Sequence, residues 1–254
     1  MLTDLGGKAG SLCEPAKKGE IRCPLMIRPT SEDVITGNLF GVLKVLNPRW
    51  WLPDLLNDAL GTERFRRQVF RKLTIDLWQK QRRYPREHLK WKEGSTEVDV
   101  VITWENPATT VFIEMKYGSN LSVQTTHNNG THGFPSDQLI RNARIGLRES
   151  GWFLEDVLFA GDRRDFVLLL VTPFPGNPLV REYRNVEGLR RSIPHGDRLK
   201  ALPQEPFIGE LGYQNLVELL RRQRRWFSRP EQRLLDDLTI YLGLKQSELL
   251  TGRS

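Results

Sequence analysis

Two carboxylates and one lysine have the side-chain types needed for metal-assisted hydrolysis of a phosphodiester bond: Asp99, Glu114 and Lys116. Hard divalent cations such as Mg²⁺ prefer carboxylate oxygens and keep waters and substrate phosphates in their remaining coordination positions. Such an ion polarises the scissile phosphate and lowers the pKa of a bound water, while a nearby lysine orients that water and balances developing charge. These residue types predict Asp99 and Glu114 as ligands of Mg²⁺, with Mn²⁺ as a substitute, and Lys116 as a catalytic residue.

The two segments that carry these residues are predicted to be the strands of one hairpin. Residues 97–104 and 110–116 are rich in β-branched side chains, which favour extended structure. Residues 106–109 between them begin with Asn-Pro, which is typical of a type I turn. The pattern therefore predicts two antiparallel strands joined by a tight turn.

The register of this hairpin decides whether the polar residues meet. A two-residue turn at 107–108 places Lys116 opposite Asp99. Because alternate side chains of a strand share a face, Glu97, Asp99, Glu114 and Lys116 are then expected on one side of the hairpin. A slip of one residue would put the two polar sets on opposite faces. Glu97 is expected at the rim of the site, with a role as a metal ligand as the alternative.

A helix is predicted ahead of the hairpin, over residues 30–46. Thr30 and Ser31 supply a hydroxyl cap, Glu32 lies in an acidic first turn, and Asn-Pro at 47–48 ends the helix. Glu32 has two interpretations at this stage. It either serves the helix dipole as a first-turn acid or is delivered by the helix to the catalytic site.

The remaining segments complete an alternating pattern of helices and strands. Residues 63–83 are predicted to be a basic helix, or a helix passing into a strand, and periodicity does not decide between these. Residues 136–147 read as a capped helix, and residues 165–173 as a central strand covered on both faces. Residues 174–210 are rich in proline and glycine and are expected to have weak structure.

Histidines and tryptophans add weaker signals. His127 and His132 lie in a polar loop without further metal ligands, so contact with substrate is favoured over zinc binding. The chain has seven tryptophans, including Trp50 and Trp226. Aromatic side chains of this kind are expected mainly in the core, with stacking on nucleic-acid bases as the alternative.

The chain is basic, with a net charge of +7 and a sequence pI near 9.6. A basic surface is the usual electrostatic footprint of a protein that binds phosphate backbones. Eleven basic and three acidic residues lie between Glu63 and Lys92, and residues 221–233 contain six arginines. A solvated helix face is the alternative interpretation of both clusters. The candidate nucleic-acid-binding residues are Arg64, Arg67, Arg82, Arg83 and Arg141.

The bulk composition is that of a globular protein, with 39% hydrophobic and 27% charged residues among 254. No apolar run approaches the roughly 20 residues that a membrane span requires. The first residues lack the pattern of a secretory signal, and the two cysteines, Cys13 and Cys23, are expected to be reduced. We therefore expect a cytoplasmic protein without a membrane partner.

Three parts are expected along the chain. Residues 1–28 read as an irregular N-terminal arm, residues 29–205 as the main domain, and residues 206–254 as a C-terminal helical extension. Within the extension, residues 214–227 have a helical pattern, and a capping box at residues 228–231 opens a second helix.

Asp99, fourteen intervening residues and the run Glu114-Met115-Lys116 resemble the motif of the PD-(D/E)XK nuclease superfamily, also called the restriction endonuclease-like fold. Val98 stands where the motif has proline, a change that the superfamily commonly tolerates. The resemblance spans roughly residues 30–173. It implies that residues 29–205 are a PD-(D/E)XK nuclease-like domain of the α/β class, in which a helix, an antiparallel hairpin, a helix and a strand build a central mixed sheet.

The resemblance also implies roles for residues outside the hairpin. Glu32 matches the acid that many members contribute from an upstream helix as an auxiliary metal ligand. Gln138, with Arg141 one turn later, is similar to the polar helix that follows the Glu-x-Lys strand in several branches. Glu32 and Gln138 are therefore expected to join the catalytic residues.

The expectation from the sequence is a Mg²⁺-dependent nuclease, a hydrolase that cuts nucleic acid, with DNA favoured. The resemblance supplies a restriction, phage-defence or repair context and a homodimer or a larger complex. The alternative is a non-catalytic nucleic-acid-binding or scaffold protein on the same fold, in which Asp99 and Lys116 form a cross-strand salt bridge. An unrelated interaction domain would require the hairpin register to fail.

Overall fold

A computed structural model describes residues 32–82, 96–118, 121, 134, 137–154, 162–199 and 201–250. Several sequence-based expectations lie outside these residues. They are the N-terminal arm over residues 1–28, the cap at Thr30 and Ser31, Arg83, and the loop with His127 and His132.

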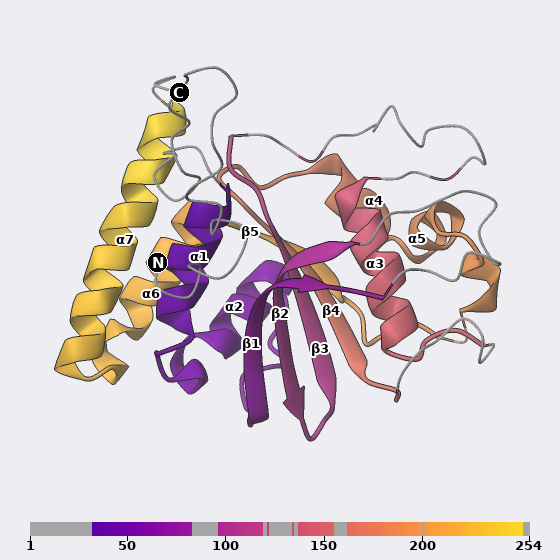
Figure 1. Ribbon diagram of the computed structural model, residues 1–254, viewed down its shortest axis with the longest axis horizontal. Helices are drawn as coiled ribbons and strands as arrows, with labels where there is room; N and C mark the ends of the chain where they lie inside the picture. The colour runs from indigo at the N-terminus through magenta and orange to yellow at the C-terminus, as the bar shows by residue number, and fades with distance from the viewer. Residues whose placement is uncertain are drawn as a thin grey trace, which may run out of the picture.

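A five-stranded mixed sheet in the order β1-β2-β3-β4-β5 forms the centre of the protein (Figure 1). The pairs β1–β2 and β2–β3 are antiparallel, whereas the pairs β3–β4 and β4–β5 are parallel. The strands are β1 (Arg71–Lys80), β2 (Glu97–Glu105), β3 (Thr109–Met115), β4 (Asp165–Thr172) and β5 (Ile208–Gly212). The α/β class and the mixed sheet expected from the sequence are confirmed.

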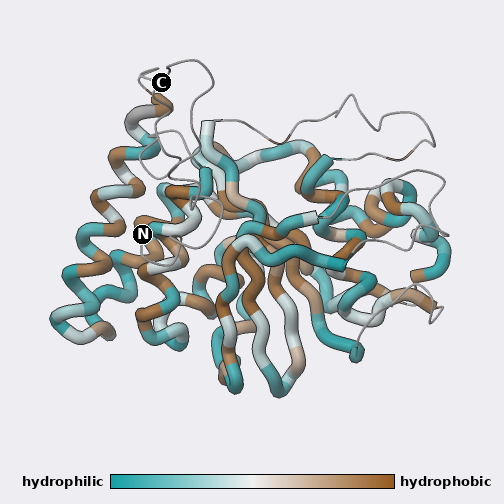
Figure 2. The backbone as a smooth tube through the Cα atoms, viewed as in Figure 1, coloured by the Kyte–Doolittle hydropathy of each residue, from teal (hydrophilic) through white to brown (hydrophobic). Residues whose placement is uncertain are grey.

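The helices cover both faces of this sheet. One face carries α1 (Glu32–Leu43), α2 (Leu52–Leu60) and α6 (Tyr213–Gln223), and α7 (Arg229–Leu250) packs outside them against α1 and α6. The other face carries α3 (Gln138–Glu149), α4 (Pro178–Arg184) and α5 (Val186–Ser192). Because both faces are covered, β4 is almost entirely apolar, and hydrophobic residues run along the central strands in Figure 2.

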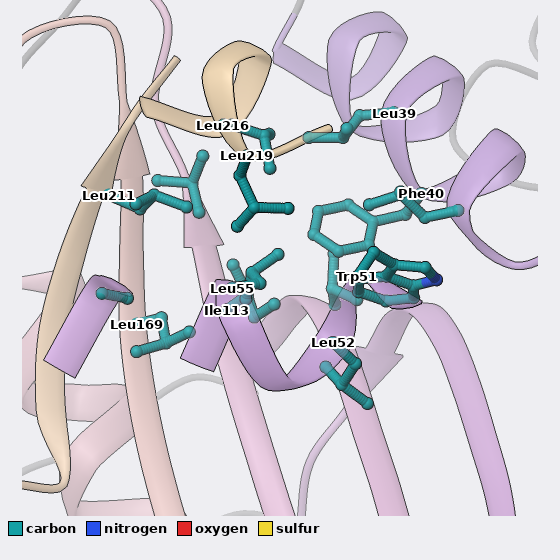
Figure 3. Close-up of a cluster of buried hydrophobic side chains, with 14 of the residues drawn as sticks. Leu39, Phe40, Trp51, Leu52, Leu55, Ile113, Leu169, Leu211, Leu216 and Leu219 are labelled. Atoms are coloured by element: carbon teal, nitrogen blue, oxygen red, sulfur yellow. The ribbon is translucent and has the colours of Figure 1, made fainter. Parts of the chain in front are cut away.

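The core on the α1 face joins elements from distant parts of the sequence. Figure 3 shows side chains of the helices packed over strand residues from β3, β4 and β5. The labelled members are Leu39, Phe40, Trp51, Leu52, Leu55, Ile113, Leu169, Leu211, Leu216 and Leu219. All of them are nearly inaccessible to solvent, so this cluster holds α1 against the sheet.

β2 and β3 form the expected antiparallel hairpin, but the predicted register and turn are wrong. Val100 pairs with Ile113 and Trp104 pairs with Thr109, a shift of two residues from the expected pairing. Residues 106–108 connect the two strands in place of a two-residue type I turn, and Asn106 has φ 60°. Asparagine adopts this left-handed conformation more readily than most residues. A shift of two residues preserves the strand faces, so the expected gathering of polar side chains is retained.

Of the two alternatives for residues 63–83, a basic helix throughout is wrong, whereas the strand of the second alternative is present without a preceding helix. Residues 71–80 form β1, an edge strand paired along its length with β2. Leu73, Ile75 and Leu77 alternate with polar residues and pack against the core. The many arginine, lysine and glutamine residues favour helix locally, but pairing with β2 decides the structure.

Two other expectations for the second half of the chain need correction. Residues 174–210 are not weakly structured, because they contain α4, α5 and β5. The side chains of Asn177 and Asn185 cap α4 and α5 at their N-termini. The sheet also extends past the expected boundary at residue 205, because β5 pairs with β4.

The C-terminal helices follow the predicted pattern. α6 is followed by a short 3-10 helix, η8 (Arg224–Trp226), and α7 begins at the expected capping box. The Glu231 carboxylate accepts hydrogen bonds from the backbone N–H and the hydroxyl of Ser228. Within the described residues, no helix is long and apolar enough to cross a membrane.

Candidate metal and catalytic site

The candidate site lies where β3, β4 and β5 end, at the upper edge of the sheet in Figure 1. Lys116 is the first residue after β3, and both its backbone N–H and its carbonyl are hydrogen-bonded. Its backbone N–H donates to the carbonyl of Val171 on β4 over 2.9 Å. Its own carbonyl accepts a hydrogen bond of 2.8 Å from the hydroxyl of Tyr213, the first residue of α6. Strands and helix together therefore set the position of Lys116.

The Lys116 ammonium bridges the sheet and α1. Its Nζ lies 2.7 Å from Oε1 of Glu114 and 3.0 Å from Oε2 of Glu32. Burial works to lower the pKa of Lys116, but the charges and hydrogen bonds of Glu114 and Glu32 outweigh it and raise the pKa above its ordinary value. Lys116 is therefore a fixed positive charge between two acids.

Glu114 is fully buried, and both of its oxygens have neighbours. Oε1 faces Lys116, and Oε2 accepts a hydrogen bond of 3.0 Å from Nδ2 of Asn142 on α3. Burial, with help from the charge of Asp99, raises the pKa of Glu114 to about 8, although Lys116 and Asn142 oppose this. The carboxylate form is thus costly at this position unless more positive charge arrives.

Asp99 lies on β2 next to the end of β3. Its Oδ2 accepts a hydrogen bond of 2.9 Å from the backbone N–H of Met115. Burial raises the pKa of Asp99 to about 6, against the hydrogen bond from Met115 and the charge of Lys116, and the charges of Glu32 and Asp33 add to the rise. Asp99 is therefore electrostatically coupled to the other acids.

Three carboxylates, those of Glu32, Asp99 and Glu114, interact with the charge of a single lysine. Asp99 and Glu114 have raised pKa values mainly because they are buried, and the charges of neighbouring acids add to the rise while Lys116 opposes it. Carboxylate oxygens of this kind suit a hard divalent ion such as Mg²⁺ or Mn²⁺, which would supply the missing positive charge. The donor chemistry fits such an ion.

The carboxylates are not already arranged around an ion. In the part of the chain that the structure describes, no group of three histidine, cysteine, aspartate or glutamate side chains forms a ready-made metal site. Nζ of Lys116 lies between Glu114 and Glu32 and contacts both. An ion that used both acids would require this ammonium to turn toward one side.

Sequence reasoning missed Asn142. It is fully buried on α3, and the only local signal is an amide among apolar helix positions. α3 is anchored at its start, where Asp137 accepts a hydrogen bond from the backbone N–H of Ile140 and another, of 2.5 Å, from the hydroxyl of Tyr183. This anchoring holds Asn142 beside Glu114.

The two α3 residues predicted from the sequence lie close to Asn142 in the chain. Gln138 is the first residue of α3 and Arg141 lies within its first turn, and both are half-buried. Helical periodicity puts Gln138 one turn before Asn142 on the same side of the helix. α3 therefore brings this side toward the site, and Asn142 is the residue that contacts an acid.

The predicted nucleic-acid-binding arginines separate in space. Arg64 lies at the opposite end of the sheet, where its guanidinium is 3.4 Å from Asp165 at the start of β4 and donates to the carbonyl of Gln204. These contacts favour a structural role for Arg64. Arg67 is exposed at that same end, whereas Arg82 is exposed after the end of β1 that pairs with Glu97. Arg82 thus lies at the same end of the sheet as the candidate site, on the edge strand, and Arg141 lies on α3.

No family model, no curated protein and no solved structure matches this chain. The class of protein therefore has to be argued from the site and the fold around it.

Proposed function

We propose that this chain is a metal-dependent nuclease of the PD-(D/E)XK type that hydrolyses phosphodiester bonds in nucleic acid, with DNA as the favoured substrate. One observation carries the proposal. Asp99 and Glu114 from adjacent strands, Lys116 at the end of β3 and Glu32 from α1 gather at one edge of the sheet, and burial raises the pKa values of the two strand acids. The order of helix, hairpin, helix and strand around this cluster supports it.

Asp99 and Glu114 would hold Mg²⁺ or Mn²⁺, and Glu32 would be an auxiliary ligand. When bound, such an ion polarises the scissile phosphate and lowers the pKa of a coordinated water. Asn142 fixes the orientation of the Glu114 carboxylate through its 3.0 Å hydrogen bond. Burial of Glu114 strengthens its attraction for a divalent cation, because the surrounding dielectric constant is low.

Lys116 would orient the attacking water and stabilise charge on the phosphate. An ammonium has three N–H donors, and Glu114 and Glu32 are two of its partners. A third donor remains for a water or a phosphate oxygen. Lys116 would have a further donor free if Glu114 or Glu32 served as a metal ligand instead of its partner.

A purely structural ion pair explains the cluster less well. A buried ion pair contributes little net stability, because the desolvation of both charges offsets their attraction. It also requires only one carboxylate for one lysine. The negative charge of Asp99 raises the pKa of Glu114 further, which makes a simple salt bridge between Glu114 and Lys116 less favourable.

The test is cleavage of labelled single-stranded, duplex and branched DNA and of RNA by the purified protein, with Mg²⁺ or Mn²⁺ against EDTA. We expect cleavage that requires the metal and falls at least about 100-fold in Lys116→Ala, the order of loss seen when one charge-stabilising group is removed. Glu105→Gln, at the far end of β2 and ion-paired with Arg164, is the matched control and should retain activity. Cleavage that survives EDTA, or wild-type cleavage by Lys116→Ala, would contradict the proposal.

A further inference from the structure

A basic cleft lies at the opposite end of α1 from the candidate site. It has a volume of about 660 Å³ and is lined by residues 47–50, Pro53 and residues 66–70. Among its lining residues are Arg49, Trp50, Arg66 and Arg67. We call it the tryptophan–arginine cleft.

Two tryptophans form a stacked pair beside this cleft. The rings of Trp50 and Trp226 are nearly parallel, at 14°, with centroids 5.3 Å apart. The guanidinium of Arg49 lies 5.1 Å from the Trp50 ring, and that of Arg225 lies 4.9 Å from the Trp226 ring. Trp226 is nevertheless 50% exposed. A large aromatic side chain held in a fixed orientation and half in solvent offers a surface for stacking.

The charge around the cleft is positive. Arg66 lies 3.3 Å from Glu63, and Arg224 from η8 pairs with Asp236 over 2.7 Å, so these two acids already have partners. Glu231 accepts hydrogen bonds from the uncharged Ser228 and interacts with the backbone N–H of Asn47 at the cleft, so it keeps its negative charge there. The arginines without an ion pair outnumber this one acid, so the local charge remains positive.

Three guanidinium groups remain to attract an anion. Within the described residues, Arg49, Arg67 and Arg225 have no carboxylate at ion-pairing distance. Guanidinium groups bind phosphates with two parallel donors and also stack on aromatic rings. Their combination with a stacked tryptophan pair fits a ligand that carries both phosphates and flat rings.

α1 sets the distance between the cleft and the candidate site. Glu32, its first residue, contacts Lys116, whereas residues 47–50 of the cleft follow its last residue, Leu43. A helix of this length spans about 18 Å. That distance corresponds to about five nucleotides of a stacked strand at about 3.4 Å each. Figure 1 shows α1 running from the upper edge of the sheet toward the junction of α6 and α7.

We infer that the tryptophan–arginine cleft is a second binding surface for a nucleic-acid strand, with phosphates on Arg49 and Arg67 and an unpaired base stacked on Trp226. The inference rests on the proposed function, because it takes the ligand to be the nucleic acid that the site at Lys116 would cut. Base stacking on aromatic side chains tolerates any sequence, since every base has a π-face. The cleft would therefore hold the substrate about five nucleotides from the cut without selecting its sequence.

The test measures binding of a labelled oligonucleotide by fluorescence anisotropy in EDTA, where the metal-dependent reaction cannot occur. Trp226→Ala should weaken binding of single strands by about tenfold and leave duplex binding less affected, because stacking contributes on the order of 1–3 kcal/mol per base. Trp226→Phe should restore most of the affinity. The salt dependence should be unchanged in both variants.

The arginines should affect the salt dependence instead. Replacing Arg49 and Arg67 together with alanine should reduce the slope of log K against log salt by about 1.4 for single strands and about 1.8 for duplex, since each lost phosphate contact removes about 0.7 or 0.9. Arg181→Ala with Arg191→Ala removes the same charge from exposed positions on α4 and α5. This control should change neither the slope nor the affinity by more than about twofold.

Three results would overturn the inference. They are wild-type affinity in Trp226→Ala, an equal loss in the Arg181 and Arg191 control, and competition by polyglutamate that matches competition by an unlabelled oligonucleotide. Failure of the proposed function has a different signature. In that case Mg²⁺ produces no cleavage, while binding in EDTA still depends on Trp226.

Discussion

Nδ2 of Asn142 donates a 3.0 Å hydrogen bond to Oε2 of Glu114, and both side chains are fully buried. This contact ties α3, on one face of the sheet, to the end of β3. Lys116 ties the same carboxylate to α1 through Glu32, on the other face. Glu114 is thus held from both layers of helices, which suits a ligand whose orientation must be fixed before an ion binds.

Asn142→Ala should therefore lower the Mg²⁺ affinity or activity by a larger factor than a merely structural loss of stability would explain. We expect apparent Mg²⁺ affinity or activity to fall about 10- to 100-fold, as for the loss of a residue that orients a metal ligand. The free energy of unfolding should fall by about 1–3 kcal/mol, because a buried oxygen of Glu114 loses its donor. The measurement is the Mg²⁺ dependence of cleavage at equal folded concentration.

Asn177→Ala is the matched control for this prediction. Asn177 is another buried asparagine, but it caps α4. Its loss should cost about 1 kcal/mol of stability and leave the Mg²⁺ dependence unchanged. If Asn142→Ala has the Mg²⁺ dependence of the wild type, Asn142 does not position the ligand.

The stability of the metal-free protein should depend on pH through the same acids. Burial raises the pKa of Glu114 from 4.5 to about 8 and that of Asp99 from 3.8 to about 6. Between these values the folded protein binds protons that the unfolded chain has released. The contribution of these groups to the free energy of unfolding is therefore full below about pH 4 and is lost as the pH rises to about 8.

Urea unfolding in EDTA from pH 5 to 8.5 measures this effect. The raised pKa keeps Lys116 protonated over the whole range, so it adds no slope. Asp99→Asn removes one titrating group and lowers the pKa of Glu114, so its stability should fall less steeply with pH than that of the wild type. Parallel pH dependences in the two proteins would show that Asp99 and Glu114 are not coupled as described.

Mg²⁺ should bind more tightly as the pH rises over the same window. An ion competes with protons for Asp99 and Glu114, so its binding releases protons. Isothermal titration at pH 6 and pH 8, in buffers of different ionisation enthalpy, should show proton release that is larger at pH 6. Affinity that is equal at both pH values would exclude these two acids as the ligands.

Arg64 should prove structural although it belongs to the basic cluster. Its side chain is only 10% exposed, and the guanidinium contacts Asp165 and the Gln204 carbonyl. Arg64→Ala should lower the free energy of unfolding by about 1 kcal/mol, because Asp165 loses its ion-pair partner and the Gln204 carbonyl loses a hydrogen bond. Oligonucleotide affinity per folded molecule should not change, and a selective loss of affinity would instead place Arg64 in the binding surface.

The sequence predicted the parts of the site that depend on local pattern. Runs of β-branched residues indicated the strands around Asp99 and Glu114, and alternation within a strand indicated their shared face. The face was predicted although the register was wrong, because a shift of two residues leaves side chains on the same side. Glu32 was placed by a helix start that is also a local signal.

The remaining features depend on contacts between distant segments. Asn142 carries no motif, and its role follows only from the packing of α3 against β3. Residues 71–80 have a composition that suits a helix, but the edge of β2 offers them a strand partner. The pairing of Trp50 with Trp226 joins residues far apart in the sequence, so no local window could indicate it.

The central claim is most directly tested by the rate of DNA strand cleavage at saturating Mg²⁺ in Asp99→Asn, compared with the wild type and with Glu105→Gln. Asp99→Asn keeps the shape of the side chain but removes the charge that would hold the ion. We expect cleavage by the wild type and by Glu105→Gln and a loss of at least about 100-fold in Asp99→Asn at equal folded concentration. Equal rates in all three proteins, or no metal-dependent cleavage by the wild type, would contradict it.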